Sequence, residues 1–374
     1  PQSSDQDAPL VQRTSPLGER LKKLIASHGP ITIEDYMTDA LFHPNDGYYT
    51  SQLPIGARGD FTTAPEVSQI FGELIGLWLV QAWTDIGEPD YFSLIELGPG
   101  RGVMMQDILR AASIRPKFLK AANVQLVETS GRLRHEQQKR LRDAPAKATW
   151  KDSFEETDEG PILLVANEFL DCLPIRQFRL TEDGWRERMV NINQELDELV
   201  FTDAYAPPID MEDPPPNCAL GDIFETRAPG NAIVEEISQR LSDFPGRALF
   251  IDYGYTEDAA GDTLQAAKKH ERWQPLDAPG LADITAHVNF QRLARAAFDA
   301  GAAAFGPVSQ ATVLDRLGLA MRAERLCQGK GQSEIAEIQD GANRIASASE
   351  MGELFKVLCV STPSLSVPAG FEPI

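Results

Sequence analysis

The segment Tyr91–Gly102 constrains the fold more than any other part of the chain, and it reads Y-F-S-L-I-E-L-G-P-G-R-G. Its apolar start suits a buried parallel strand, three glycines alternate behind Glu96, and a helical stretch begins at Val103. A strand that turns through glycines into a helix brings backbone N–H groups close to a ligand. The segment therefore predicts a cofactor site at the carboxyl end of a sheet.

The spacing of Gly98, Gly100 and Gly102 separates two kinds of cofactor. A dinucleotide fingerprint, G-x-G-x-x-G, requires its third glycine where this chain has Val103. The G-x-G-x-G pattern seen here, with Glu96 two residues ahead of the first glycine, is common in class I S-adenosylmethionine (SAM) methyltransferases. Because a glycine-rich turn alone is weak evidence, the neighbouring strand ends have to be weighed with it.

Acids close the next two predicted strands. Glu128 follows one strand, where its carboxylate can accept hydrogen bonds from both ribose hydroxyls. Asp152 and Ser153 follow the next, where the acid can reach the adenine amino group and the Ser153 N–H a ring nitrogen. Each acid alone is more often a solvated loop residue, but three successive acidic strand ends at one sheet edge favour a SAM site.

The pattern of apolar runs predicts the architecture. From Tyr91 onward, strands and helices alternate as in a doubly wound parallel α/β sheet, and Pro161–Ala166 is its most apolar strand. We expect an N-terminal helical cap at residues 1–90, with one long helix from Pro65 to about Ile86, and a core at residues 91–374. Alternating residues at about 175–228 predict an antiparallel β-meander inserted on the edge of this core.

Composition limits the function classes. Acids outnumber bases 56 to 35, for a net charge of −21, which argues against an electrostatic nucleic-acid binder. The four cysteines and five histidines are scattered without metal-ligand spacing, so we expect no metal site and a reducing compartment. No apolar run is long enough for a membrane span, so we expect no membrane insertion.

The chain resembles the MidA-like methyltransferases over nearly its whole length. The resemblance begins with the glycine segment at residues 95–110 and continues in five further motifs. These are His43-Pro-x-x-Gly-Tyr-Tyr49, Gly59-Asp-Phe-x-Thr-Ala-Pro-Glu-x-Ser68, Ala166-Asn-Glu-Phe-Leu-Asp-x-Leu-Pro174, Ile251-Asp-Tyr-Gly254 and Asp283-Ile-Thr-Ala-His-Val288. Two positions depart from the family pattern: Asn289 replaces an aspartate, and Ser309–Thr312 lacks a glutamine-glycine pair.

The family includes the mitochondrial complex I assembly factor that methylates arginine. The resemblance implies a seven-stranded class I methyltransferase sheet, SAM as cofactor, and symmetric dimethylation of arginine on a core subunit of NADH dehydrogenase during assembly. The implied partner is a protein, and a homodimer is left open. We expect a bacterial cytoplasmic location, because no basic leader is visible, or the mitochondrial matrix in a eukaryote.

The acceptor chemistry points to carboxylates. A guanidinium is protonated in water, so its nitrogen is a poor nucleophile unless acids orient it and draw charge away. Glu168 and Asp171 are the best-placed catalytic acids, and His287 is a candidate proton acceptor. Asn167 joins the cofactor residues named above. The remaining acids are candidate substrate contacts: Asp60, Glu66, Asp252 and Asp283.

Purely structural roles stay open for some of these candidate residues. Asn167 and Glu168 could serve as helix-capping residues, and a lone histidine such as His287 is more often structural. Two other functions also remain: a non-catalytic assembly chaperone that retains a SAM-binding fold, and a nicotinamide-dependent oxidoreductase, which Val103 disfavours.

Overall fold

The computed structural model describes residues 14–51 and 62–372, and the chain forms two compact units. Unit 1 comprises residues 1–52, 174–226 and 261–285, and unit 2 comprises residues 53–173, 227–260 and 286–374. This division follows the spatial compactness of the chain. The predicted domain boundary at residue 90 stays a prediction.

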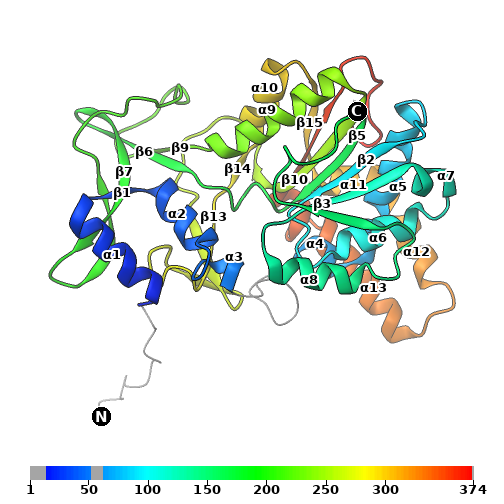
Figure 1. Cartoon of the computed structure of the whole chain (residues 1–374), viewed down its shortest axis with the longest axis horizontal. Helices are drawn as coiled ribbons and strands as arrows, with labels where there is room; N and C mark the ends of the chain where they lie inside the picture. Colours follow the sequence, from blue (N-terminus) through cyan, green and yellow to red (C-terminus); the bar gives the residue numbers. More distant parts are fainter. Residues whose placement is uncertain (1–13, 52–61, 373–374) are drawn as a thin grey trace, which may run out of the picture. The chain divides into compact units, whose positions relative to one another are not determined.

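Unit 2 is built around a seven-stranded sheet in the order β4–β3–β2–β5–β10–β16–β15 (Figure 1). The strands from β4 to β10 are parallel, whereas β16 is antiparallel to both β10 and β15. A short strand, β14, pairs with the end of β10. The strands are β2 (Phe92–Leu97), β3 (Ala122–Val127), β4 (Ala148–Lys151), β5 (Ile162–Asn167), β10 (Gly246–Tyr255), β14 (Val288–Asn289), β15 (Ala303–Ser309) and β16 (Phe355–Ser361). The predicted doubly wound sheet is confirmed.

Two apolar cores cover the two faces of this sheet. Every residue of β2 and β5 is buried, as expected for central parallel strands, and their side chains alternate between the cores. One core contains residues of α5, α6 and α11, and the other contains residues of α9 and α10. The helices of unit 2 are α4 (Ala64–Val67), α5 (Gln69–Asp85), α6 (Val103–Ala112), α7 (Pro116–Ala121), α8 (Gly131–Arg140), α9 (Ala228–Asp243), α10 (Phe290–Asp299), α11 (Gln310–Arg316), α12 (Leu319–Cys327), α13 (Gln332–Ala346) and α14 (Met351–Leu354).

The predicted single helix from Pro65 to Ile86 is wrong, because Ser68 divides it into α4 and α5. Ser68 has extended backbone angles (φ −149°, ψ 124°), and its hydroxyl accepts a hydrogen bond from the Ile70 N–H at 3.3 Å. This side-chain bond caps the N-terminus of α5, and the backbone hydrogen bonds of one continuous helix are interrupted there. Gly341 of α13 approaches the break closely, since a Cβ atom there would stand 3.1 Å from the Val67 carbonyl oxygen.

Unit 1 contains two antiparallel sheets. The predicted meander forms β6 (Arg176–Thr181), β7 (Gly184–Asn193) and β8 (Glu198–Asp203), and it is joined by β1 (Ile31–Thr32) and β9 (Ile223–Thr226). The second sheet consists of β11 (Gln265–Lys268), β12 (Glu271–Trp273) and β13 (Asp283–Thr285). The helices of the unit are α1 (Pro16–His28), α2 (Ile33–Phe42) and α3 (Tyr48–Ser51).

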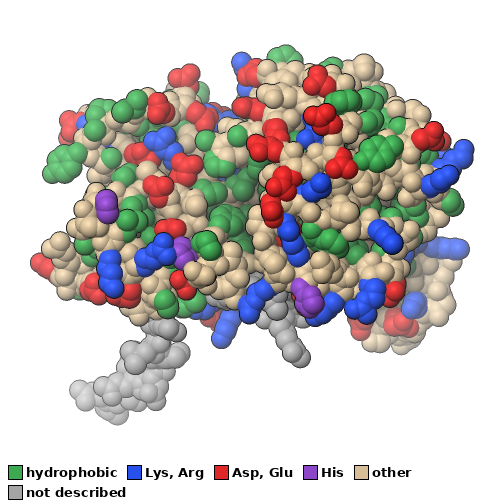
Figure 2. Space-filling view, in the orientation of Figure 1, with side chains coloured by type: hydrophobic (Ala, Val, Ile, Leu, Met, Phe, Trp, Pro, Cys, Tyr) green, Lys and Arg blue, Asp and Glu red, His purple; other side chains and the backbone are tan. Residues whose placement is uncertain are grey.

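Charged side chains of both signs are interspersed over the face of the molecule shown in Figure 2, so on that face the acidic excess is distributed over many elements. Among residues 14–51 and 62–372, no helix is both long and apolar enough to cross a bilayer.

Candidate active site

The glycine turn after β2 has the backbone geometry that its sequence predicts. Gly98, Gly100 and Gly102 all adopt positive φ, at 60°, 52° and 76°. Side chains are disfavoured in this region, and at Gly98 a Cβ atom would also stand 2.8 Å from the Phe169 ring. Gly102 caps α6 without a side chain, which leaves the first N–H groups of that helix for a ligand.

Glu96 and Asn167 each carry a buried side-chain oxygen that has no hydrogen bond to the described part of the chain. Glu96 is 2% exposed and Asn167 is 8% exposed, and each has one side-chain oxygen without a hydrogen bond among the described residues. They stand near the carboxyl ends of the neighbouring strands β2 and β5. Burial raises the pKa of Glu96 to about 8. A buried acceptor without a donor costs free energy, so this pair is suited to a ligand that brings donors, such as an ammonium group.

Glu128 is held in place by a side chain that the sequence analysis did not single out. Its carboxylate accepts hydrogen bonds from the Ser130 N–H at 2.8 Å and from Gln137 Nε2 at 3.2 Å. The same Gln137 nitrogen donates to the Gly100 carbonyl at 2.7 Å, and Trp150 Nε1 donates to Gln137 Oε1 at 2.7 Å. Gln137 therefore joins the glycine turn, the ribose-side acid and β4. A carboxylate has about four lone-pair sites, so Glu128 retains acceptors for ribose hydroxyls.

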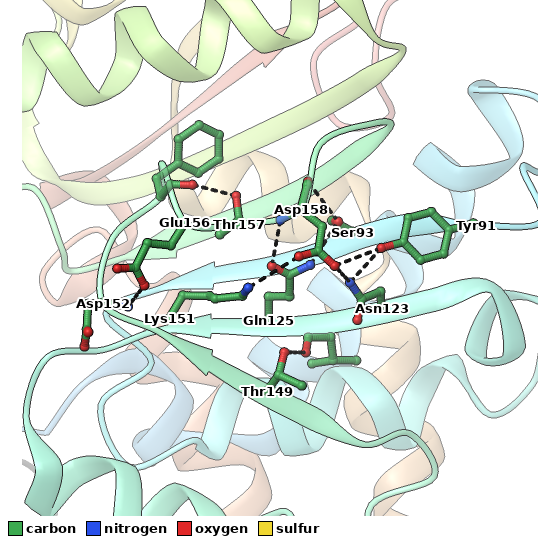
Figure 3. Close-up of polar contacts among 12 residues, drawn as sticks. Tyr91, Ser93, Asn123, Gln125, Thr149, Lys151, Asp152, Glu156, Thr157 and Asp158 are labelled. Carbon is green, nitrogen blue, oxygen red and sulfur yellow. Dashed lines mark hydrogen bonds and ion pairs between the residues drawn. The ribbon is translucent and has the colours of Figure 1, made fainter.

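The loop after β4, which carries Asp152 and Ser153, is fastened at several points (Figure 3). The Asp152 N–H donates to Glu156 at 3.0 Å, and farther along the Asp158 N–H donates to Gln125 at 3.1 Å. The Asp152 carboxylate is two-thirds exposed and pairs with Arg134. Ser153 is partly buried. The predicted adenine contacts thus lie on a braced loop, with the carboxylate open to solvent.

Three carboxyl groups, those of Glu168, Asp171 and Asp252, gather beyond the end of β5, where its pairing with β10 stops. The Asp252 carboxylate accepts hydrogen bonds from the Leu170 and Asp171 N–H groups, at 2.9 and 3.1 Å. Glu168, at φ 50°, accepts from the Ala64 N–H at 3.2 Å and from the Asn167 amide at 3.1 Å. The Asp252 carboxylate thereby stabilises the turn that carries Glu168 and Asp171. The positive φ of Glu168, which is not a glycine, indicates backbone strain in that turn.

Burial raises the pKa values of these acids, and for Glu168 and Asp252 the neighbouring carboxylates add to the rise. Burial raises the pKa of Glu168 to about 8, and the neighbouring Asp171 charge adds to the rise. Burial also raises the pKa of Asp252 well above its usual range, with contributions from Asp171 and Glu168. The pKa of Asp171 is raised by burial as well, although a hydrogen bond from Tyr253 opposes the rise. A cation entering this cluster would restore the ionised forms.

His287 lies beside the acid cluster through Tyr253. The two rings meet edge to face, with centroids 5.4 Å apart and an interplanar angle of 82°. The pKa of His287 is lowered by burial and by the positive charge of Arg227, so the imidazole is neutral at physiological pH and can accept a proton. Tyr253 thus contacts His287 and also donates to Asp171.

The remaining sequence candidates are distributed over both units. In unit 2, Glu66 of α4 forms an ion pair with Arg101 of the glycine turn at 3.5 Å. In unit 1, Asp283 of β13 accepts a hydrogen bond from the Tyr49 hydroxyl at 2.9 Å. Asp60 lies outside the described residues.

Comparison with known proteins identifies the family. A family model described as S-adenosyl-L-methionine-dependent methyltransferase matches residues 74–308, more than half of the chain. The chain belongs to this methyltransferase family. Among the relatives of this methyltransferase, "Protein arginine methyltransferase NDUFAF7, mitochondrial" of Mus musculus is 35% identical, over 94% of this chain and 86% of its own. The protein of the same name from Homo sapiens is 32% identical, over 99% and 93%.

Solved structures agree with this assignment. A crystal structure from Burkholderia thailandensis with bound S-adenosyl-homocysteine is 30% identical and superposes with a TM-score of 0.81, over 99% of this chain and 96% of that one. A native crystal structure from the same organism gives a TM-score of 0.82 at 28% identity. SAM is therefore the cofactor of this methyltransferase. The predicted family, fold class and cofactor are confirmed.

The residues of the methyltransferase site fit this cofactor. SAM carries an α-ammonium group, two ribose hydroxyls and a sulfonium methyl, and the first two are hydrogen-bond donors. The unpartnered oxygens of Glu96 and Asn167 suit the ammonium group, and the Glu128 carboxylate suits the hydroxyls. Assignment of each predicted site residue to its role remains a proposal.

Proposed function

We propose that this methyltransferase modifies arginine in a protein, forming symmetric dimethylarginine on a core subunit of NADH dehydrogenase during its assembly. The observation that carries the arginine assignment is the gathering of Glu168, Asp171 and Asp252 where the pairing of β5 with β10 stops. Phe169, within the same turn, contacts the position of Gly98, so the acids lie next to the cofactor turn. Relatives named protein arginine methyltransferase support the acceptor class, and the family resemblance supports the partner.

The acid cluster suits a guanidinium acceptor. A planar, cationic fork fits carboxylate oxygens in a bidentate way, and its positive charge would lower the raised pKa values of the acids around it. Glu168 is the proposed orienting carboxylate, because Asp252 already accepts three backbone hydrogen bonds, from Leu170, Asp171 and Tyr253. Orientation of the attacking nitrogen in line with the methyl group would supply most of the rate.

The cofactor supplies an electrophilic methyl carbon on a sulfonium. The arginine nitrogen forms its bond to this carbon while the carbon–sulfur bond breaks and the electron pair goes to sulfur. The methylated nitrogen must then lose one proton. Glu168 in its ionised form and neutral His287 are the two proposed acceptors for that proton.

A labelling experiment tests the function. The protein is incubated with SAM labelled in its methyl group and a lysate of cells that lack its gene, and labelled proteins are hydrolysed to amino acids. We expect label in symmetric dimethylarginine on one NADH dehydrogenase subunit. Label on lysine, or only on small molecules, would overturn the arginine assignment.

The Glu168→Gln variant distinguishes a non-catalytic assembly chaperone from an active methyltransferase. If this variant binds the partner and supports assembly while forming no product, binding rather than methylation is the biological activity. The oxidoreductase alternative is set aside, because the chain belongs to a SAM-dependent family.

A further inference from the structure

Arg227 is a buried cation to which the proposed chemistry assigns no contact with cofactor or substrate. It precedes α9 and is 8% exposed. Its Nη1 donates to three carbonyl oxygens of the turn after β5, those of Leu170, Asp171 (3.1 Å) and Leu173 (2.6 Å). Its Nη2 donates to the carbonyls of Ala286 (2.8 Å) and His287 (3.3 Å). One guanidinium thus ties together two loops, and five carbonyl dipoles solvate its charge.

The turn at residues 170–173 is held on one side by Asp252 and on the other by Arg227. On its N–H side the Asp252 carboxylate accepts from Leu170 and Asp171, and on its carbonyl side Arg227 donates. A direct backbone bond, from the Ala286 N–H to the Asp171 carbonyl at 3.0 Å, joins this turn to the histidine loop. These contacts fix the peptide planes from which the Asp171 and His287 side chains extend.

Gly230 provides the space that Arg227 needs. A Cβ atom on Gly230, in the first turn of α9, would stand 2.8 Å from Arg227 Cδ and 3.1 Å from Cγ. Glycine is otherwise unfavourable inside a helix, so alanine would be the better residue for α9 alone. The alkyl part of Arg227 occupies the gap, and this directs the guanidinium toward the two loops.

We propose that Arg227 is a positioning residue for methyl transfer, which holds the acid turn and the His287 loop in one fixed arrangement without touching cofactor or substrate. The inference rests on the proposed function for its kinetic part only. A planar fork with two terminal nitrogens can serve carbonyls on two loops, whereas a lysine offers a single nitrogen. Charge alone is therefore insufficient.

Hydrogen exchange tests the positioning without requiring activity. The full chain with bound S-adenosyl-homocysteine is compared with Arg227→Lys and Gly230→Ala, with Arg295→Lys as the control because Arg295 lies exposed on α10 and pairs with Asp299. We expect amide exchange at residues 168–173 and 286–288 to rise together by roughly 10- to 100-fold in both test variants, because charge-assisted hydrogen bonds are lost. Unchanged exchange in either loop would overturn the proposal.

Kinetics tests the catalytic consequence. Arg227→Lys should reduce single-turnover methyl transfer by about 100-fold, while the Kd of S-adenosyl-homocysteine changes by less than about threefold. Equal losses of rate and cofactor affinity, or loosened loops with an unchanged rate, would refute a positioning role. If the wild-type chain binds S-adenosyl-homocysteine but methylates no protein, the proposed function fails, and the exchange result still decides whether Arg227 fixes the two loops.

Discussion

Phe169 lies against Gly98, so that a Cβ atom built on Gly98 would stand 2.8 Å from the Cδ2 atom of the phenyl ring. The glycine turn after β2 and the acid turn after β5 therefore share a contact. The proposed cofactor turn and the proposed acceptor turn therefore meet at the Phe169 ring. A change at Gly98 should alter both.

Gly98→Ala should abolish measurable SAM binding, because it adds backbone strain at φ 60° and a collision with Phe169. Isothermal titration with S-adenosyl-homocysteine measures the effect. Gly87→Ala is the matched control, since Gly87 also has positive φ (91°) but meets nothing within 4 Å. The control should lose about 1–2 kcal/mol of unfolding free energy and keep its affinity. Normal binding by Gly98→Ala would refute the assigned cofactor turn.

Gln137→Ala should weaken S-adenosyl-homocysteine binding by about tenfold, and it should lower the free energy of unfolding by about 1–3 kcal/mol. The side chain is fully buried and serves Gly100, Glu128 and Trp150, which would lose a partner together. Titration and urea unfolding measure the two effects. Gln81→Ala, on an exposed part of α5, should change neither, and a similar response from both variants would contradict the bracing role.

The rate of methyl transfer should depend on the ionisation of Glu168. Its pKa of about 8 means that the group is largely protonated at pH 7 in the free protein. Since only the ionised form can orient a guanidinium, kcat/KM should rise about tenfold per pH unit up to pH 8 and then level. Glu168→Gln should lose about 10²- to 10⁴-fold in rate, and its pH–rate profile should lack this rising limb. A limb that persists in this variant would assign the titration to another group.

Glu96→Gln should make the cofactor-free protein less sensitive to pH. The folded-state pKa of Glu96, about 8, is above its value in an unfolded chain, about 4.3. Its protonated form therefore contributes stability that is present below pH 4 and is lost as pH rises toward 8.

Urea unfolding across this range should show that the free energy of unfolding of Glu96→Gln rises relative to that of the wild type as pH rises. The difference should be on the order of a few kcal/mol at pH 8. Glu136→Gln, on the exposed surface of α8, should show no such gain. Parallel curves for Glu96→Gln and the wild type would contradict a buried, protonated Glu96.

Local patterns predicted much of the fold. The alternation of apolar runs located the parallel strands, and the three glycines predicted the turn that joins β2 to α6. Pro116 begins α7, as its fixed φ and missing N–H favour at the first position of a helix. These features depend on the preferences of neighbouring residues, which a sequence displays directly.

Contacts between distant segments were beyond such patterns. Gln137 and Gly100 are 37 residues apart, and Arg227 and Leu170 are 57 apart, so nothing in either local sequence marks the pairs. The helix break at Ser68 was also missed, because its close neighbour Gly341 belongs to α13. The short strands β11 to β13 lack a long alternating pattern. Each of these features is decided by tertiary packing, which one chain read in order does not reveal.

The bond from the Ser15 hydroxyl to the Pro279 carbonyl, 2.7 Å long, connects residues that are 264 positions apart. At about 5–20 residues per second, the ribosome needs roughly 13–53 s to deliver the second partner after the first. During that interval α1 has emerged, but Leu17 lacks Gly280, against which it lies in the finished protein, and Ser15 lacks Pro279. The start of α1 therefore reaches its final packing only after most of the chain has been made.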